Sequence, residues 1–176
     1  MPHSLEALNT CARGAFVAAL GHLFEHSPWV AAETFEKRPF GDVEGLHAAL
    51  CETMRKAPAE RRLALVRAHP DLAGRMARQG GLTSSSAREQ SAAGLNRLAP
   101  AEAAEIERLN GAYRARFGFP FVICARLNAK DAILSAMRAR AGNTPEEELS
   151  TALDEIAKIA RLRLNEAIAK ENQNAR

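Results

Sequence analysis

No stretch of this sequence is apolar and long enough to cross a bilayer, and the first residues, MPHSLEALNT, lack the basic segment and apolar core of a secretory signal. These absences argue against a membrane-spanning or secreted protein, and we expect a soluble intracellular chain. The last residues, NAR, do not resemble a peroxisomal signal of the S-K-L type, so we predict a cytoplasmic location.

Cysteine is scarce, and charge of one sign is nowhere concentrated. The 176 residues include three cysteines, Cys11, Cys51 and Cys124, an odd number without C-x-x-C spacing, which favours buried free thiols in a reducing compartment. The 24 basic and 21 acidic residues give a formal net charge of +3, but they are interspersed along the chain. This distribution argues against a basic arm that binds nucleic acid.

Several catalytic and cofactor motifs are also missing. The sequence contains no Walker motif, no G-x-G-x-x-G loop, no G-x-S-x-G nucleophile elbow and no H-E-x-x-H helix. His22 and His26 are spaced i,i+4 and could chelate a metal ion, but no third ligand accompanies them. We therefore predict no metal site and interpret both histidines as surface or packing residues.

The chain has helical periodicity almost throughout. Apolar residues recur at helical spacing in stretches separated by proline, glycine and serine, which predicts an all-α fold. With 47% apolar residues, no linker and no repeat, residues 1–176 are predicted to form one compact multi-helix domain. The only strand-like stretch, FGFPFVIC at residues 117–124, has no partner strand, so we expect an extended segment or the start of an apolar helix.

Cap residues predict where several helices begin. Helical spacing covers residues 5–24 with Ser4 as N-cap, Ser27 precedes the helix of SPWVAAETFEKRP, and Thr144 and Glu147 form a capping box at the last helix. Further helices are expected over residues 42–57, 58–69, 86–99, 100–118 and 128–142.

The heptapeptide HPDLAGR, residues 69–75, ends one of these helical runs. Pro70 disfavours the α conformation of the residue before it, which places His69 at a helix terminus with its imidazole at a mouth or edge. That position suits a catalytic base. The simpler interpretation, taken alone, is a histidine that caps or bonds a nearby carboxylate such as Asp71.

Ser86 and Glu89 have the S-x-x-E spacing of a capping box, which requires no further function. The same residues also suit an anionic substrate, because a helix N-terminus presents free N–H groups and a positive dipole end.

Arg163 interrupts the apolar stripe of the last helix, where a guanidinium needs an anion to receive its donors. A snorkelling side chain, a buried pair with Glu or Asp, and a substrate ligand are all open interpretations. We favour the third, in which the free protein holds an arginine that is satisfied mainly by water.

Four ordered segments together carry a family resemblance: HPDLAGR, LTSSSAREQSAAGL, FGFPFVICAR and GNTPEEELSTALDEIAKIARLRL. With RPFGDVEGLHAAL upstream, they closely resemble the OHCU decarboxylase family, whose members decarboxylate 2-oxo-4-hydroxy-4-carboxy-5-ureidoimidazoline (OHCU) to (S)-allantoin in urate breakdown. The resemblance covers most of the chain. It implies an all-α lyase of purine metabolism, commonly a homodimer, which acts on a small molecule, involves no nucleic acid or membrane, and needs neither a metal nor an organic cofactor.

The resemblance also implies roles for individual residues. His69 matches the family's catalytic histidine, and Glu89 is expected to assist it by orienting either the imidazole or the ureido N–H groups of the substrate. His69 would remove or orient the hydroxyl proton of the substrate and then deliver a proton. The substrate-binding residues implied by the resemblance are Pro70, Ser86, Glu89, Phe119, Phe121, Ile123 and Arg163.

Two alternatives remain at this stage. A non-catalytic helical binding module for an anionic partner would cluster its arginines on one exposed face, whereas most arginines here alternate with acidic or apolar residues. A decarboxylase of the same family that acts on a related ureide would have the same motifs.

Overall fold

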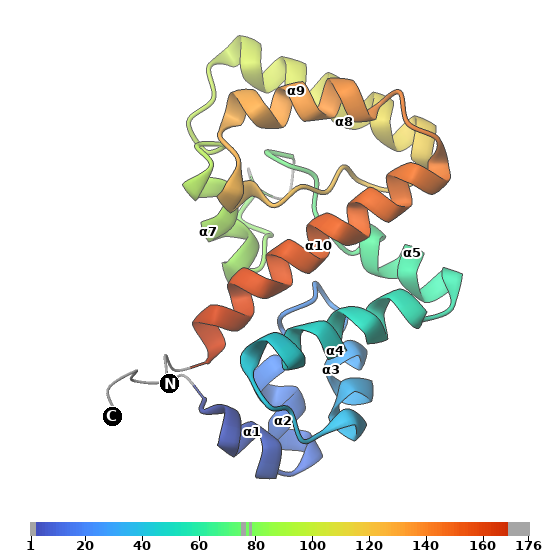
Figure 1. Cartoon of the computed structure of the whole chain (residues 1–176). Helices are drawn as coiled ribbons and strands as arrows, with labels where there is room; N and C mark the ends of the chain where they lie inside the picture. The colour runs from blue at the N-terminus through green and yellow to red at the C-terminus, as the bar shows by residue number, and fades with distance from the viewer. Residues whose placement is uncertain (1–2, 75–76, 78, 169–176) are drawn as a thin grey trace. The chain divides into compact units, whose positions relative to one another are not determined.

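The computed structural model describes residues 3–74, 77 and 79–168, and within these ranges all regular structure is helical (Figure 1), apart from one isolated bridge between His3 and Ile168. The all-α prediction is confirmed. Two compact units divide the chain, one formed by residues 1–65 with 157–176 and the other by residues 66–156. A single domain over residues 1–176 stays a prediction.

The first unit is built from short helices around a core of leucine and phenylalanine side chains. Its helices are α1 (Leu5–Thr10), α2 (Arg13–Leu20), α3 (Trp29–Thr34), the 3-10 turn η1 (Phe35–Lys37), α4 (Val43–Lys56), most of α5 (Ala59–Arg67) and the last part of α10 (Pro145–Ala167). Helix α3 packs against both α2 and α4. Phe16 of α2 and the following Phe24 are almost completely buried.

The predicted helix over residues 5–24 is broken at Cys11, and Arg38 provides the physical reason. Its Nη1 donates to the carbonyl oxygens of Leu8, Asn9 and Cys11 at 3.2, 3.1 and 2.8 Å. The guanidinium thus satisfies carbonyl groups that a continuing helix would have used itself. The predicted Ser4 cap is confirmed, because its Oγ accepts the Ala7 N–H at 3.1 Å.

The prediction that Ser27 caps α3 is wrong. The Ser27 hydroxyl donates to the carbonyl oxygen of Glu25 at 2.9 Å, and Pro28 occupies the N-cap position without a side-chain cap.

The second unit contains α7 (Ser84–Ala92), α8 (Pro100–Phe117), η2 (Ala125–Leu127), α9 (Lys130–Arg140) and the first part of α10. Helix α8 packs against α9, and α7 packs against η2. Gly118 ends α8 as predicted, with a φ of +73° that glycine adopts easily. The capping box at α10 is also confirmed, since Glu147 accepts the Thr144 N–H at 2.9 Å and Thr144 accepts the Glu147 N–H at 3.3 Å.

Residues 119–124 form an extended segment, which is one of the two structures expected from the sequence, and an aromatic cluster lies against it. The ring of Tyr113 is 4.6, 6.0 and 5.4 Å from the rings of Phe117, Phe119 and Phe121. Burial, with the carboxylate of Glu148 beside the hydroxyl, raises the pKa of Tyr113 far above its usual value.

Glu148 is the most buried carboxylate of this unit, with an exposed fraction of 0%. It accepts hydrogen bonds from Tyr113 Oη, from Arg140 Nε at 2.8 Å and Nη2, and from Asn143 Nδ2 at 2.8 Å. The sequence analysis did not single it out. Its position four residues before the buried Ala152, on the same side of α10, was the available signal.

We expect Glu148→Ala to lower the free energy of unfolding by about 3–5 kcal/mol, because it leaves the guanidinium of Arg140 buried without its carboxylate. Urea unfolding followed by circular dichroism measures this change. Glu52→Ala is the matched control. Although hydrogen bonds from Lys37 and Lys56 lower the pKa of Glu52 to about 2, that carboxylate is exposed and water screens it, so stability should hardly change. Equal losses in the two variants would contradict this interpretation.

Candidate active site

His69 lies just beyond the end of α5, as Pro70 predicts. Its backbone N–H donates to the Val66 carbonyl at 3.1 Å, and its side chain is buried, with the residue 6% exposed. Asp71 was the carboxylate expected near the imidazole in the simpler interpretation. Its two oxygens accept instead from Arg114 Nε at 3.0 and 3.1 Å.

Helix α7 carries Ser86 and Glu89, but these residues do not form its cap. Thr83 is the N-cap, and its Oγ1 accepts the Ser86 N–H at 3.3 Å, so Ser86 lies inside the first turn. The capping-box interpretation of Ser86 and Glu89 is therefore wrong. Ser86 is 5% exposed and Glu89 is half-buried.

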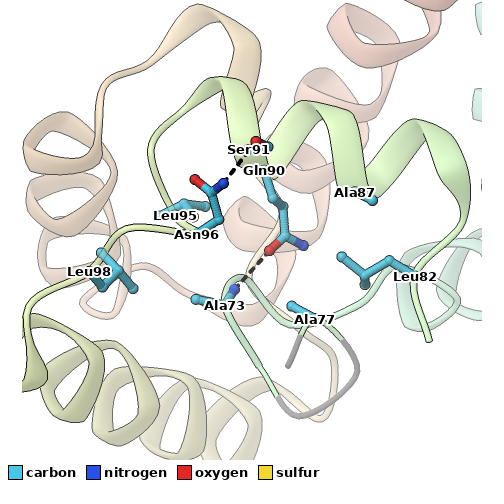
Figure 2. Close-up of a pocket in the computed structure, with 9 residues that line it drawn as sticks. All are labelled: Ala73, Ala77, Leu82, Ala87, Gln90, Ser91, Leu95, Asn96 and Leu98. Carbon is cyan, nitrogen blue, oxygen red and sulfur yellow. Dashed lines mark hydrogen bonds between the residues drawn. The ribbon is translucent and has the colours of Figure 1, made fainter. Parts of the chain in front are cut away.

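Three contacts bring the predicted segments together within the second unit. The Ala73 N–H donates to Gln90 Oε1 of α7 at 2.8 Å, as Figure 2 shows. Arg67 Nε, two residues before His69, donates to the Gly118 carbonyl at 3.0 Å, and α7 packs against η2. The histidine segment, α7 and the extended segment 119–124 are therefore neighbours.

Two charged side chains hold the extended segment by binding its backbone groups. Arg140 Nη1 donates to the Val122 carbonyl at 2.8 Å, and the Cys124 N–H donates to Glu155 Oε2 at 2.8 Å. Arg140 also lies over the Phe121 ring, 4.2 Å from its centroid. Phe119, Phe121 and Ile123, which the resemblance implies as substrate-binding residues, are all buried.

A cavity of about 470 Å³ opens beside α7. It is lined by Ala73, Ala77, Leu82, Ala87, Gln90, Ser91, Leu95, Asn96 and Leu98, and Figure 2 shows Gln90 reaching across from α7 to Ala73. None of the site residues predicted from the sequence lines this cavity. Ser86 and Glu89 lie on a neighbouring side of the helix, because one turn contains about 3.6 residues.

Arg163 belongs to the first unit, where it forms a buried ion pair. Its Nη1 is 3.0 Å from Glu25 Oε2 and 3.4 Å from the carbonyl oxygens of His22 and Leu23, and the two paired side chains are 3% and 2% exposed. The interpretation that water mainly satisfies this arginine is therefore wrong. The Arg163 guanidinium has the Glu25 carboxylate as its partner, and its contact with substrate stays a prediction.

Glu25 was missed by the sequence analysis because it lies in a turn-rich segment, FEHSP, at residues 24–28. His26 has a φ of +46° there, a strained value for a residue other than glycine. Burial, followed by the positive charge of Arg163, lowers the pKa of the neighbouring His22. The position of Glu25 directly after the apolar Leu23 and Phe24 was the local signal.

Neither a metal cluster nor a membrane helix is found in the part of the chain that the structure describes. No group of three or more histidine, cysteine, aspartate or glutamate side chains in it could hold a metal ion. No helix in these residues is long and apolar enough to span a membrane.

The comparisons with known proteins agree on one family. The model of the OHCU decarboxylase family matches residues 9–165. The chain belongs to this family. It is 42% identical over 164 residues to a 2-oxo-4-hydroxy-4-carboxy-5-ureidoimidazoline decarboxylase of Amia calva, with 93% of this chain and 94% of that protein covered. It is 40% identical over 163 residues to a protein of the same name from Halalkalicoccus jeotgali, with 93% and 90% covered.

A solved structure supports the same assignment. The crystal structure of (S)-allantoin synthase superposes with a TM-score of 0.73 at 30% identity, and the match covers 94% of this chain. It covers 54% of that chain, so this member of the OHCU decarboxylase family spans about half the length of the synthase.

The position of the α7 cap can be tested by amide hydrogen exchange. We expect the residue-86 amide to exchange faster in Thr83→Ala, because its acceptor is removed, and stability to fall by about 0.5–2 kcal/mol. In Ser86→Ala the same amide should stay protected, since Thr83 still accepts it. Faster exchange of the residue-89 amide in Ser86→Ala, with the residue-86 amide unchanged in Thr83→Ala, would restore Ser86 as the cap.

A second prediction concerns the buried pair of Arg163 and Glu25 in this member of the OHCU decarboxylase family. Arg163→Met should cost about 3–5 kcal/mol of unfolding free energy, because Glu25 is left buried without its cation. Arg161→Met is the control on the same helix, since its pair with Glu44 is partly exposed and should contribute about 0–1 kcal/mol. The double variant Glu25→Leu with Arg163→Met should recover part of the loss. Unfolding curves that do not separate the two arginine variants would argue against a stabilising pair.

Proposed function

We propose that this chain decarboxylates OHCU to (S)-allantoin and CO2 with neither a metal nor an organic cofactor. The family membership over residues 9–165 supports the reaction, and the relatives named above carry the name of that decarboxylase. The structural observation that carries the proposal is the buried His69, on a segment joined through Ala73 to the helix of Ser86 and Glu89. An imidazole can act as acid or base near neutral pH.

The substrate itself explains why no cofactor is needed. Its carboxylate and hydroxyl share one ring carbon, and the next ring carbon carries the ureido group and a C=N bond. When the bond to the carboxylate breaks, CO2 leaves and the electron pair forms a C=C bond between these carbons, while the C=N electrons move onto nitrogen, which takes a proton. The ring thus accepts the electrons that a cofactor would otherwise hold.

His69 has two tasks in this scheme. It takes or orients the hydroxyl proton, so that the hydroxyl becomes the carbonyl of allantoin, and it delivers a proton to the carbon that bears the ureido group. Delivery to one face of the ring yields one enantiomer. Glu89 would orient the ureido N–H groups or the imidazole, with Ser86 as a hydrogen-bond partner.

The remaining residues are proposed to bind the substrate. Pro70 and the backbone at Phe119, Phe121 and Ile123 form the wall, which excludes water and so strengthens electrostatic contacts. Arg163 is the proposed cation. An arginine paired tightly with the departing carboxylate would stabilise the ground state and slow the loss of CO2. Its pair with Glu25 reduces that attraction, which favours a role at a ring carbonyl, whose oxygen shares the negative charge while the C=N electrons move onto the nitrogen.

We further propose that the protein works as a homodimer in the cytoplasm. The resemblance to commonly dimeric enzymes supports the first proposal. The three cysteines, none of which forms a disulfide within the described residues, are consistent with a reducing compartment.

The test uses freshly generated OHCU with a chelator present, and follows the circular dichroism of the product. We expect wild type to yield (S)-allantoin, and His69→Asn to lose about 100- to 10,000-fold in kcat/KM because the general acid–base is removed. The residual product of that variant should lose its enantiomeric excess, since solvent protonates both faces.

His47→Asn is the matched control, because His47 Nε2 lies 2.9 Å from the Ala157 carbonyl in the first unit and has no assigned role in the reaction. It should lower stability and leave turnover by the folded protein unchanged. Near-normal activity of His69→Asn would reject the mechanism. Turnover of a related ureide without turnover of OHCU would reject the substrate but keep the reaction class.

A further inference from the structure

The peptide group between Leu72 and Ala73 is bound at both ends by side-chain amides. Asn110 of α8 donates from Nδ2 to the Leu72 carbonyl at 2.9 Å, and Gln90 of α7 accepts the Ala73 N–H at 2.8 Å (Figure 2). The two residues are buried, at 7% and 6% exposure. We call Asn110 and Gln90 the amide clamp. One peptide plane is therefore held from two helices at once.

The clamped peptide belongs to a strained turn. Ala73 has a φ of +49°, in the left-handed region that residues other than glycine rarely adopt. The turn is closed by the Gly74 N–H, which donates to the Asp71 carbonyl at 3.3 Å. Such a conformation persists only where the surroundings determine it. The amide clamp supplies two of those constraints.

The segment from His69 to Asp71 lies between two fixed points. On one side the His69 N–H is bonded to the Val66 carbonyl, and on the other side the clamp fixes the peptide after Leu72. Pro70 removes one further rotation, because its ring fixes φ. A shift of the clamped peptide is therefore expected to move the backbone of His69 as well.

Asn110 holds the clamp at a cost to stability. Its Oδ1 is buried and finds no hydrogen-bond donor among the residues that the structure describes. A buried acceptor without a donor is destabilising, and native structures contain few of them. The hydrogen bond that Asn110 does make is the one from its Nδ2 to the Leu72 carbonyl.

We propose that Asn110 and Gln90 are positioning residues that hold the imidazole of His69 in its productive orientation. The proposal rests on the proposed catalytic function of His69, and the clamp acts through the backbone of residues 69–73. A misplacement of a catalytic group by about 1 Å can cost on the order of 100-fold in rate. The loss belongs in kcat, since substrate binding does not require the proton transfer.

Asn110→Leu is the main test. This variant removes the donor to Leu72 and the unsatisfied Oδ1 together, and the two effects on stability oppose each other. We expect kcat to fall by about 10- to 100-fold, with KM and the thermal midpoint close to wild type. A wild-type kcat would overturn the proposal. A rise in KM without a fall in kcat would also overturn it, because that pattern indicates contact with the substrate.

Asn110→Asp tests the donor itself. The carboxylate keeps the shape of the amide but brings an oxygen against the Leu72 carbonyl, and only its protonated form can donate. Since burial raises the pKa of such a carboxyl group, the ratio of kcat in this variant to kcat in wild type should rise as the pH falls. A ratio that stays constant with pH would show that the donor is not required.

Asn9→Leu is the matched control. Asn9 also donates an amide to a backbone carbonyl at 2.9 Å, that of Phe40, but it lies in the first unit. This variant should lose stability and keep the kcat of the folded protein. Equal losses of kcat in Asn9→Leu and Asn110→Leu would overturn the proposal.

The His69 imidazole can also be observed without substrate, by proton NMR of its Hε1 resonance, assigned by its absence in His69→Asn. We expect this resonance to move or broaden in Asn110→Leu and to remain unchanged in Asn9→Leu. An unchanged resonance in Asn110→Leu would reject the positioning role even if OHCU is turned over. A changed resonance in a protein that does not turn over OHCU would reject the proposed function while supporting the clamp.

Discussion

The buried carboxylate of Glu148 is the interaction on which the second unit depends. It stands at the start of α10 and receives donors from Tyr113 of α8, Arg140 of α9 and Asn143 of the turn between α9 and α10. A fully buried carboxylate is tolerable only when such donors surround it, because the loss of hydration costs several kcal/mol. The helices α8, α9 and α10 must therefore pack so that these donors reach the Glu148 carboxylate.

The Glu148 carboxylate also fixes part of the candidate site, through Arg140. Arg140, held by Glu148, donates to the Val122 carbonyl and lies over Phe121, and so fixes a segment that has no helix or strand of its own. Directly before that segment, the Gly118 carbonyl accepts a hydrogen bond from Arg67, two residues before His69. An irregular segment needs partners for its backbone groups, and here charged side chains supply them.

Arginine has the same use in the first unit. Arg38 binds three carbonyl oxygens at the end of α1, and Arg163 binds Glu25 together with two carbonyl oxygens of the segment after α2. The planar guanidinium, with five donors, can serve several acceptors at once. Arg163 therefore pairs with a protein carboxylate. Its place in an apolar stripe of the sequence did not decide between such a pair and the other interpretations.

The sequence by itself determined the features that depend on neighbours a few residues away: the helical class, the Ser4 cap, the capping box of Thr144 and Glu147, the end of α8 at Gly118 and the place of His69 after its helix. Only the tertiary structure decided which polar side chains are buried. Glu146 and Glu147 are exposed while Glu148 is fully buried, and Ser86 has a cap spacing but lies inside its helix. The partner of Arg163 lies 138 residues earlier, and that of Asn110 lies 38 residues earlier. Local periodicity cannot predict such pairs, because helix packing, and not spacing along the chain, brings their atoms together.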